Sequence, residues 1–251
     1  MFTTNKVPLQ IFAPILILIL WMIADGLKIV NPVFLPSLKD VAINIINIFL
    51  LDGFYAVGFT LYRTFTSLII TSLIAIPVGL ILGLNKNLYT STELLIDFFR
   101  SVPATAFFPI FLLFLGIGDM AKIGISVFVC FWILLINTYY GVKNIPATRL
   151  KVAKVYKAEG YNLLRFVIFY DSLPQIVIGL RLSLSISLII TIVAEMFIGT
   201  RYGLGKIIYD SYAIYDTAQL FAAIFITGIL GYILNKLFIS TEKKFIHWIG
   251  K

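Results

Sequence analysis

Apolar and polar residues alternate in long blocks along this chain. A helix needs roughly 20 apolar residues to cross the hydrocarbon core of a bilayer, with a range of about 17 to 25. Runs that approach or meet this length predict an all-α, polytopic membrane protein with six transmembrane helices in a single domain over residues 1–251. The six predicted spans are Val7–Ala24, Thr64–Leu84, Ser101–Gly118, Ile123–Val142, Leu182–Gly199 and Thr217–Asn235.

Residues 29–59 contain no full span. Their stretch Val41–Leu51 has apolar positions at near-helical spacing, which predicts a short interfacial helix on the outer membrane surface. Proline interrupts the spans that follow: Pro77 lies within the second, and Pro103 and Pro109 lie around the third. We expect kinks there, which neighbouring helices can accommodate. The pair Gly79 and Gly83 predicts a close helix–helix approach.

The longest polar interruption runs from Tyr140 to Arg181, and its centre is a basic loop over residues 143–180. Apolar positions at helical spacing predict two short helices, 147–157 and 161–169, with a glycine turn at Gly160. Such an elbow could dock onto a cytoplasmic partner. The alternative is an ordinary basic loop that rests on the bilayer.

Composition excludes a soluble protein. Hydrophobic residues make up 60% of the chain, charged residues only 13%, and the mean hydropathy is +1.00. In a membrane protein the net charge of +8 indicates orientation and not nucleic-acid binding. With both termini cytoplasmic, thirteen of the twenty basic residues lie on the cytoplasmic side and six on the other. We therefore expect a multi-pass protein of the cell (inner or plasma) membrane.

The sequence lacks the motifs that catalysis requires. The dipeptide Gly205-Lys206 has neither the upstream glycine nor the following Ser or Thr of a phosphate-binding loop. The single cysteine Cys130 and the single histidine His247 form no metal-ligand pattern. We expect no enzymatic activity and no cofactor in this chain, so any ATP and Mg²⁺ would be bound by a partner.

Polar residues within the spans are candidates for a translocation path. Glu195 interrupts the fifth span without an obvious counter-ion nearby, and a buried charge must face water or the bundle interior. Ser183, Ser187 and Thr191 lie near its face. Alternatively, Glu195 pairs with Arg201 or caps a polar turn, and the hydroxyls join helices. Phe108, beside Pro109, could gate a path or belong to the core.

Short segments, in a fixed order, make the chain resemble the membrane (permease) subunit of binding-protein-dependent ABC importers. The likeness is to the type I fold and to the branch that serves nitrate, sulfonate, taurine, bicarbonate and pyrimidine precursors. It rests on Leu35–Ser37, Thr60–Thr64, Ile76–Gly83, Arg100–Ala104, Pro109–Ile110, Phe114–Gly118, Leu173–Pro174, Gly179–Arg181, Ala194–Met196 and Gly203–Gly205.

The resemblance implies that the central loop couples this chain to an ATPase subunit. The family's Glu-Ala-Ala signature falls on Lys151-Val152-Ala153, of which only Ala153 matches, and the glycine that follows it falls on Lys157. Gly160 could serve the turn instead. The implied coupling residues are Ala153, Lys154, Val155, Tyr156, Lys157, Ala158, Glu159 and Gly160.

The resemblance also implies partners and a substrate class. The expected partners are two copies of an ATP-binding subunit, an extracytoplasmic solute-binding protein, a second copy of this chain and the lipid bilayer. A small anion such as nitrate, a sulfonate, taurine or bicarbonate is the expected solute, with a pyrimidine-type vitamin precursor as the alternative. An ion-coupled secondary transporter is the rival class, but such proteins show internal repeats and several buried carboxylates.

Overall fold

The computed structural model describes residues 7–51 and 53–245, and these form helices without a strand. The first half contains α1 (Val7–Gly26), α2 (Leu38–Leu50), α3 (Gly53–Leu84), α4 (Lys86–Ser101), the 3₁₀ turn η1 (Ala104–Phe107), α5 (Phe108–Leu115) and α6 (Asp119–Lys143). The second half contains α7 (Ala147–Val155), α8 (Gly160–Leu163), the π-helical η2 (Leu164–Ile168), α9 (Phe169–Phe197), α10 (Leu204–Ala213) and α11 (Thr217–Phe245).

Helices α3, α6 and α9 form the centre of the molecule, and small residues allow them to approach closely. A Cβ atom built on Gly79 of α3 would lie 2.6 Å from Cβ of Thr138 on α6, and one on Gly83 would lie 2.5 Å from Cβ of Val142. The close approach predicted for this glycine pair is confirmed. On α9, Gly179 meets Asn137 of α6 in the same way. Such contacts replace hydrophobic burial as the source of helix association in lipid.

Within the described residues, four helices are long and apolar enough to span a membrane: 53–84, 119–143, 160–197 and 217–242. The predicted third span, Ser101–Gly118, is not one straight helix. The chain leaves α4 at Val102, which is extended before Pro103, and α5 continues at 95° to α4. Counting this bent pair as one span gives five. The kink predicted at Pro103 is thus confirmed, and hydropathy alone did not show that α4 would form the other arm of the bend.

The short helix predicted over Val41–Leu51 is confirmed as α2, but the span that follows begins earlier than the predicted Thr64. Helix α2 packs against α11 through the buried residues Val41 and Ile48, and α3 already begins at Gly53. The predicted first span coincides with α1, whose described apolar part, Phe12–Gly26, is shorter than a full span. Trp21 ties α1 to the rest of the molecule, through a hydrogen bond to the carbonyl of Pro36 and ring contacts with α11.

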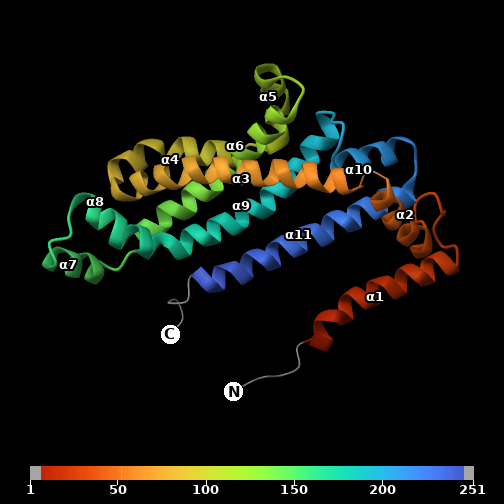
Figure 1. The fold of residues 1–251 in the computed structure, drawn as a ribbon, viewed down its shortest axis with the longest axis horizontal. Coiled ribbons are helices and arrows are strands. Elements are labelled where there is room, and N and C mark those ends of the chain that lie inside the picture. The colour runs from red at the N-terminus through yellow and green to blue at the C-terminus, as the bar shows by residue number, and fades with distance from the viewer. Residues whose placement is uncertain (1–6, 52, 246–251) are drawn as a thin grey trace.

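The two ends of the bundle carry different structures. Helices α7 and α8 project from one end, while α2 and α10 lie at the opposite end (Figure 1). Two short helices were expected in the basic loop, and α7 and α8 lie there. The loop is shorter than predicted because η2 and α9 continue from α8 as one helical stretch.

Candidate functional site

A buried ion pair joins α3 to α9 at the end of the bundle that carries α10. Arg63 of α3 donates from Nη1 to Oε1 of Glu195 on α9 at 2.5 Å, and both side chains are fully buried. Glu195 therefore has a counter-ion, which is not the Arg201 considered from the sequence. Arg63 directly precedes the predicted second span, Thr64–Leu84, and belongs to Thr60–Thr64, one of the segments that carried the resemblance. The resemblance of this segment drew attention to Arg63, but nothing in the sequence indicated that Arg63 pairs with Glu195.

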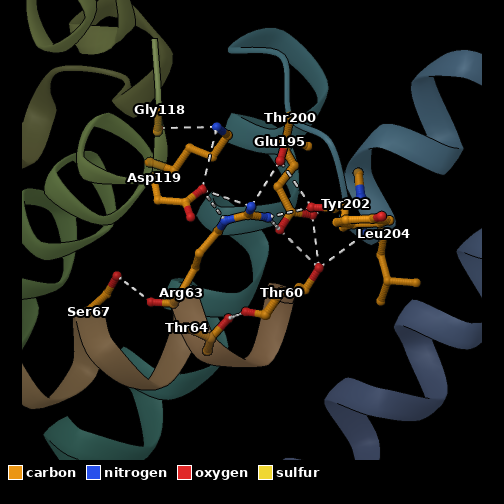
Figure 2. A network of polar contacts seen from close by, with 12 residues as sticks. Thr60, Arg63, Thr64, Ser67, Gly118, Asp119, Glu195, Thr200, Tyr202 and Leu204 are labelled. Atoms are coloured by element: carbon orange, nitrogen blue, oxygen red, sulfur yellow. Dashed lines mark hydrogen bonds and ion pairs between the residues drawn. The ribbon is translucent and has the colours of Figure 1, made fainter. Parts of the chain in front are cut away.

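Backbone and hydroxyl donors complete the coordination of Glu195. The Thr60 hydroxyl lies 2.9 Å from both carboxylate oxygens and accepts the N–H of Leu204 at 3.0 Å. The N–H of Gly205 donates to Oε2 at 3.0 Å. A Cβ atom at Gly203 would lie 2.5 Å from Cδ of Glu195, and one at Gly205 would lie 2.1 Å from the carbonyl oxygen of Ile192. Glycine at both positions is what lets α10 sit on the carboxylate (Figure 2).

The network extends to α6 and to the loop before α10. Arg63 donates from Nε to Asp119 at 2.9 Å and from Nη2 to the Thr200 hydroxyl at 2.9 Å, and Nη1 also donates to the Tyr202 carbonyl (Figure 2). Lys122, which is buried, donates to the Gly118 carbonyl and lies 3.9 Å from Asp119. Two cations thus offset two carboxylates. This balance limits the cost of burying charge and fixes four segments to one another.

The predicted pathway hydroxyls lie inside the subunit. Ser187 is 2.9 Å from Ser126 of α6 and donates to the carbonyl of Thr64 on α3, and Ser183 meets Cys130. Thr191 is also buried. Ser183 and Ser187 form a polar seam between α3, α6 and α9, as hydroxyls do when they join helices, whereas the Thr191 hydroxyl has no hydrogen-bond partner among the described residues. Phe108 is buried at the start of α5, beside Ala121 and Ile125 of α6 and near the Phe197 ring.

A second candidate site is the elbow, defined here as residues 147–168. Helix α7 ends in two backbone bonds, from the N–H of Lys157 to the Lys154 carbonyl and from the N–H of Ala158 to the Ala153 carbonyl. These two hydrogen bonds form a Schellman cap, in which the residue after the end of the helix adopts the left-handed backbone conformation. Lys157 supplies it with φ +54°, at the position on which the family glycine falls. Gly160, also at φ +54°, begins α8 instead.

The elbow is anchored on one face and open on the other. Ala153 is buried, whereas Val155 and Tyr156 are 80% and 82% exposed. An ion pair between Arg149 of α7 and Asp171 of α9 ties the elbow to the long helix. Lys154, Lys157 and Glu159 complete the exposed rim, and Ala158 lines the groove beneath it. Helix α7 is thus fixed to α9 on one face and exposes apolar and basic side chains to solvent on the other.

No cluster of three or more His, Cys, Asp or Glu side chains that could hold a metal ion occurs in the part of the chain that the structure describes.

Comparison with known proteins places these features in context. Residues 75–243 match the family described as binding-protein-dependent transport system inner membrane component. The chain is 26% identical over 254 residues to the taurine transport system permease protein TauC of Escherichia coli, covering 99% of this chain and 92% of that one. It is 29% identical over 182 residues to the bicarbonate transport system permease protein CmpB of Synechococcus elongatus, covering 72% and 63%.

A solved structure shares the fold. The chain superposes on one from the inward-facing MetNI methionine ABC transporter with a TM-score of 0.67 and 21% identity. The match covers 78% of this chain and 95% of that chain.

Proposed function

Because the chain belongs to the family of inner membrane components of binding-protein-dependent transport systems, it is a permease subunit of an ABC importer, and we propose that its elbow couples it to a separate ATPase. Two copies of the chain would enclose the translocation path. Two ATPase subunits and an extracytoplasmic binding protein would complete the transporter. The chain itself would contribute the path and the lever.

The single observation that carries this proposal is the construction of the elbow. Val155 and Tyr156 expose apolar surface at the end of the bundle, where a partner can cover it. Ala153 and the Arg149–Asp171 ion pair hold α7 against α9. From α8 onward the helix continues through the bundle to Glu195. A displacement applied at the elbow would therefore move a span as a rigid lever.

The charge distribution supports a cytoplasmic elbow. Arg149, Lys151, Lys154, Lys157 and Arg165 all lie between α6 and α9. An excess of Lys and Arg marks the cytoplasmic side of a membrane protein. The network around Arg63 would then lie at the outer end, where it would hold α10 to the spans as the elbow end moves.

The named relatives support an anionic solute. One relative is named for taurine transport and another for bicarbonate transport; taurine carries a sulfonate group beside its ammonium group, and bicarbonate is an anion. We place this chain with importers of small anions. A pyrimidine-type solute would require a neutral recognition site.

Co-purification with the ATPase subunit encoded beside this chain tests the coupling. Val155→Asp puts a carboxylate on the exposed face of the elbow, and burying an unpaired charge in the contact should release the ATPase. Ile214→Asp is the matched control, since Ile214 is 71% exposed at the opposite end. The account predicts that only Val155→Asp loses the ATPase while both variants remain inserted. Equal retention by both would refute the elbow as the coupling surface.

A further inference from the structure

Helix α4 presents three different faces. Tyr89, Ile96 and Phe99 point toward the bundle and contact α6, which leaves the rest of the helix exposed. At 3.6 residues per turn, Glu93, Asp97 and Arg100 share one exposed face. The apolar residues Leu94, Leu95 and Phe98 occupy the other exposed face. One face suits lipid, and the charged one does not.

Ring contacts give the depth of that charged face. The ring of Tyr89 stacks on Tyr139 at 3.8 Å, and the ring of Phe99 stacks on Trp132 at 5.1 Å. Helix α4 therefore runs antiparallel to α6, and Phe99 lies level with the middle of the span Asp119–Lys143. Arg100 is the next residue in the chain after Phe99, and from the sequence alone it was counted among the cytoplasmic charges. Arg100 thus lies close to the level of the middle of α6.

Arg100 is weakly neutralised at this depth. Its Nη1 lies 3.7 Å from Oδ1 of Asp97, and the side chains are 47% and 69% exposed. Charged side chains at the bilayer centre face water or a protein interior because contact with lipid tails is costly. The Arg63–Glu195 pair meets this requirement by burial, but Arg100 and Asp97 do not. In the assembled transporter their exposed face must therefore border water or the second copy of the chain.

A cavity opens beside Arg100 at the bend between α4 and α5. Its volume is about 260 Å³, several times the roughly 30 Å³ that one water occupies in the liquid. Arg100 forms one part of the wall, and aromatic and aliphatic side chains form most of the rest. The lining includes Phe99, Val102, Phe107, Phe128 and Trp132. Within the described residues, the buried Nε1 of Trp132 has no hydrogen-bond acceptor.

We propose that this cavity is a substrate site halfway along the translocation path, which takes an organic anion with its acidic group on Arg100 and its apolar part among the aromatic rings. A sulfonate or carboxylate accepts charge-assisted hydrogen bonds from a guanidinium group. An alkyl or aryl tail fills apolar space that a bare nitrate or bicarbonate would leave empty. The inference rests on the proposed anion importer and names its solute class.

Cysteine accessibility tests the aqueous face. Asp97→Cys and Phe98→Cys are adjacent, both on exposed positions of α4, and the only native cysteine, Cys130, is buried. In the complete complex in membranes, a water-soluble thiol reagent should label the variant at 97 at least about tenfold faster than the one at 98. Equal rates, or no labelling at 97, would overturn the proposal.

Ligand binding tests the cavity. In the purified permease–ATPase complex in nanodiscs, pentane-1-sulfonate should quench tryptophan fluorescence, and Trp132→Phe should remove that signal. Arg100→Gln should raise the Kd by roughly tenfold to a hundredfold, the range for loss of one charged hydrogen bond. Arg181→Gln, remote from the cavity, should leave the Kd unchanged. Val102→Trp fills the cavity and should abolish binding even if Arg100→Gln is unstable.

Uptake by the same complex with its binding protein distinguishes a failure of the cavity proposal from a failure of the proposed importer function. If ATP drives anion uptake but pentane-1-sulfonate gives no Trp132-dependent signal, or binds Arg100→Gln as tightly as wild type, the cavity proposal is wrong and the importer stands. If nitrate binds the cavity as tightly as pentane-1-sulfonate, the assignment to organic anions is wrong. If none of the anions is taken up, the proposed function itself fails.

Discussion

Arg63 and Glu195 are 132 residues apart in the sequence and form a buried ion pair at the end of the three-helix centre. The pair gathers segments Thr60–Thr64, Ala194–Met196 and Gly203–Gly205 at one point. Because Asp119 and Lys122 join the same network, it fastens α3, α6, α9 and α10 together. We call this network of Arg63, Lys122, Asp119 and Glu195 the joint; each of its charges lies beside an opposite charge.

Breaking this joint on one side should be costly. Glu195→Ala leaves the Arg63 guanidinium buried without its main partner, and loss of one member of a buried pair costs about 3–5 kcal/mol. The free energy of unfolding of the purified protein in detergent should fall by that amount. Asp210→Ala, which removes only an exposed pair with Lys206, is the control and should change it by less than about 1 kcal/mol. Comparable losses of unfolding free energy in both variants would show that the buried Arg63–Glu195 pair is no more important for stability than an exposed pair.

Gly205 should not tolerate a side chain. A Cβ atom there would lie 2.1 Å from the Ile192 carbonyl oxygen, so Gly205→Ala must push α10 away from Glu195. Overpacking of this kind costs roughly 1–3 kcal/mol. Gly228→Ala is the matched control, because a Cβ atom added at Gly228 would meet nothing within 4 Å and the change favours the helix. Thermal unfolding should separate the two, and a Gly205→Ala midpoint at the wild-type value would argue against the packing.

Replacing Lys157 by glycine should stabilise the C-terminal cap of α7. The Lys157 backbone has φ +54°, a conformation that costs an L-residue roughly 1–2 kcal/mol and glycine almost nothing. Lys157→Gly should therefore slow amide hydrogen exchange in α7, since the Schellman cap is stabilised. Lys154→Gly, within the helix, should speed exchange because glycine weakens a helix interior. Faster exchange in Lys157→Gly would show that the cap does not depend on this conformation.

Local patterns in the sequence predicted the local features. Helical spacing and basic residues located the short helices of the elbow, and Gly79 and Gly83 indicated a close contact that α6 supplies. Periodicity showed that Ser183, Ser187 and Thr191 lie near one face of a helix. It could not show that α3 and α6 cover that face, because this depends on packing between distant segments.

Two errors have the same physical origin. The counter-ion of Glu195 was sought nearby in the sequence at Arg201, while packing brought Arg63 from another span. The third span was predicted to begin at Ser101 with a kink at Pro103, whereas the helix before the bend is α4, and the chain turns by 95° after Val102. Residues 85–100 were predicted to be a cytoplasmic segment between spans, whereas residues 86–101 form α4, whose Phe99 stacks on Trp132 of α6.

As an ABC importer permease, this chain should move its solute only when the ATPase subunit hydrolyses ATP. This requirement is tested by uptake into proteoliposomes that contain the permease, its ATPase and its binding protein, with taurine, pentane-1-sulfonate, bicarbonate and nitrate as labelled solutes. Uptake of at least one of these solutes should require ATP and should be lost in Val155→Asp. Uptake by the permease alone, driven by an ion gradient without ATP, would contradict this requirement.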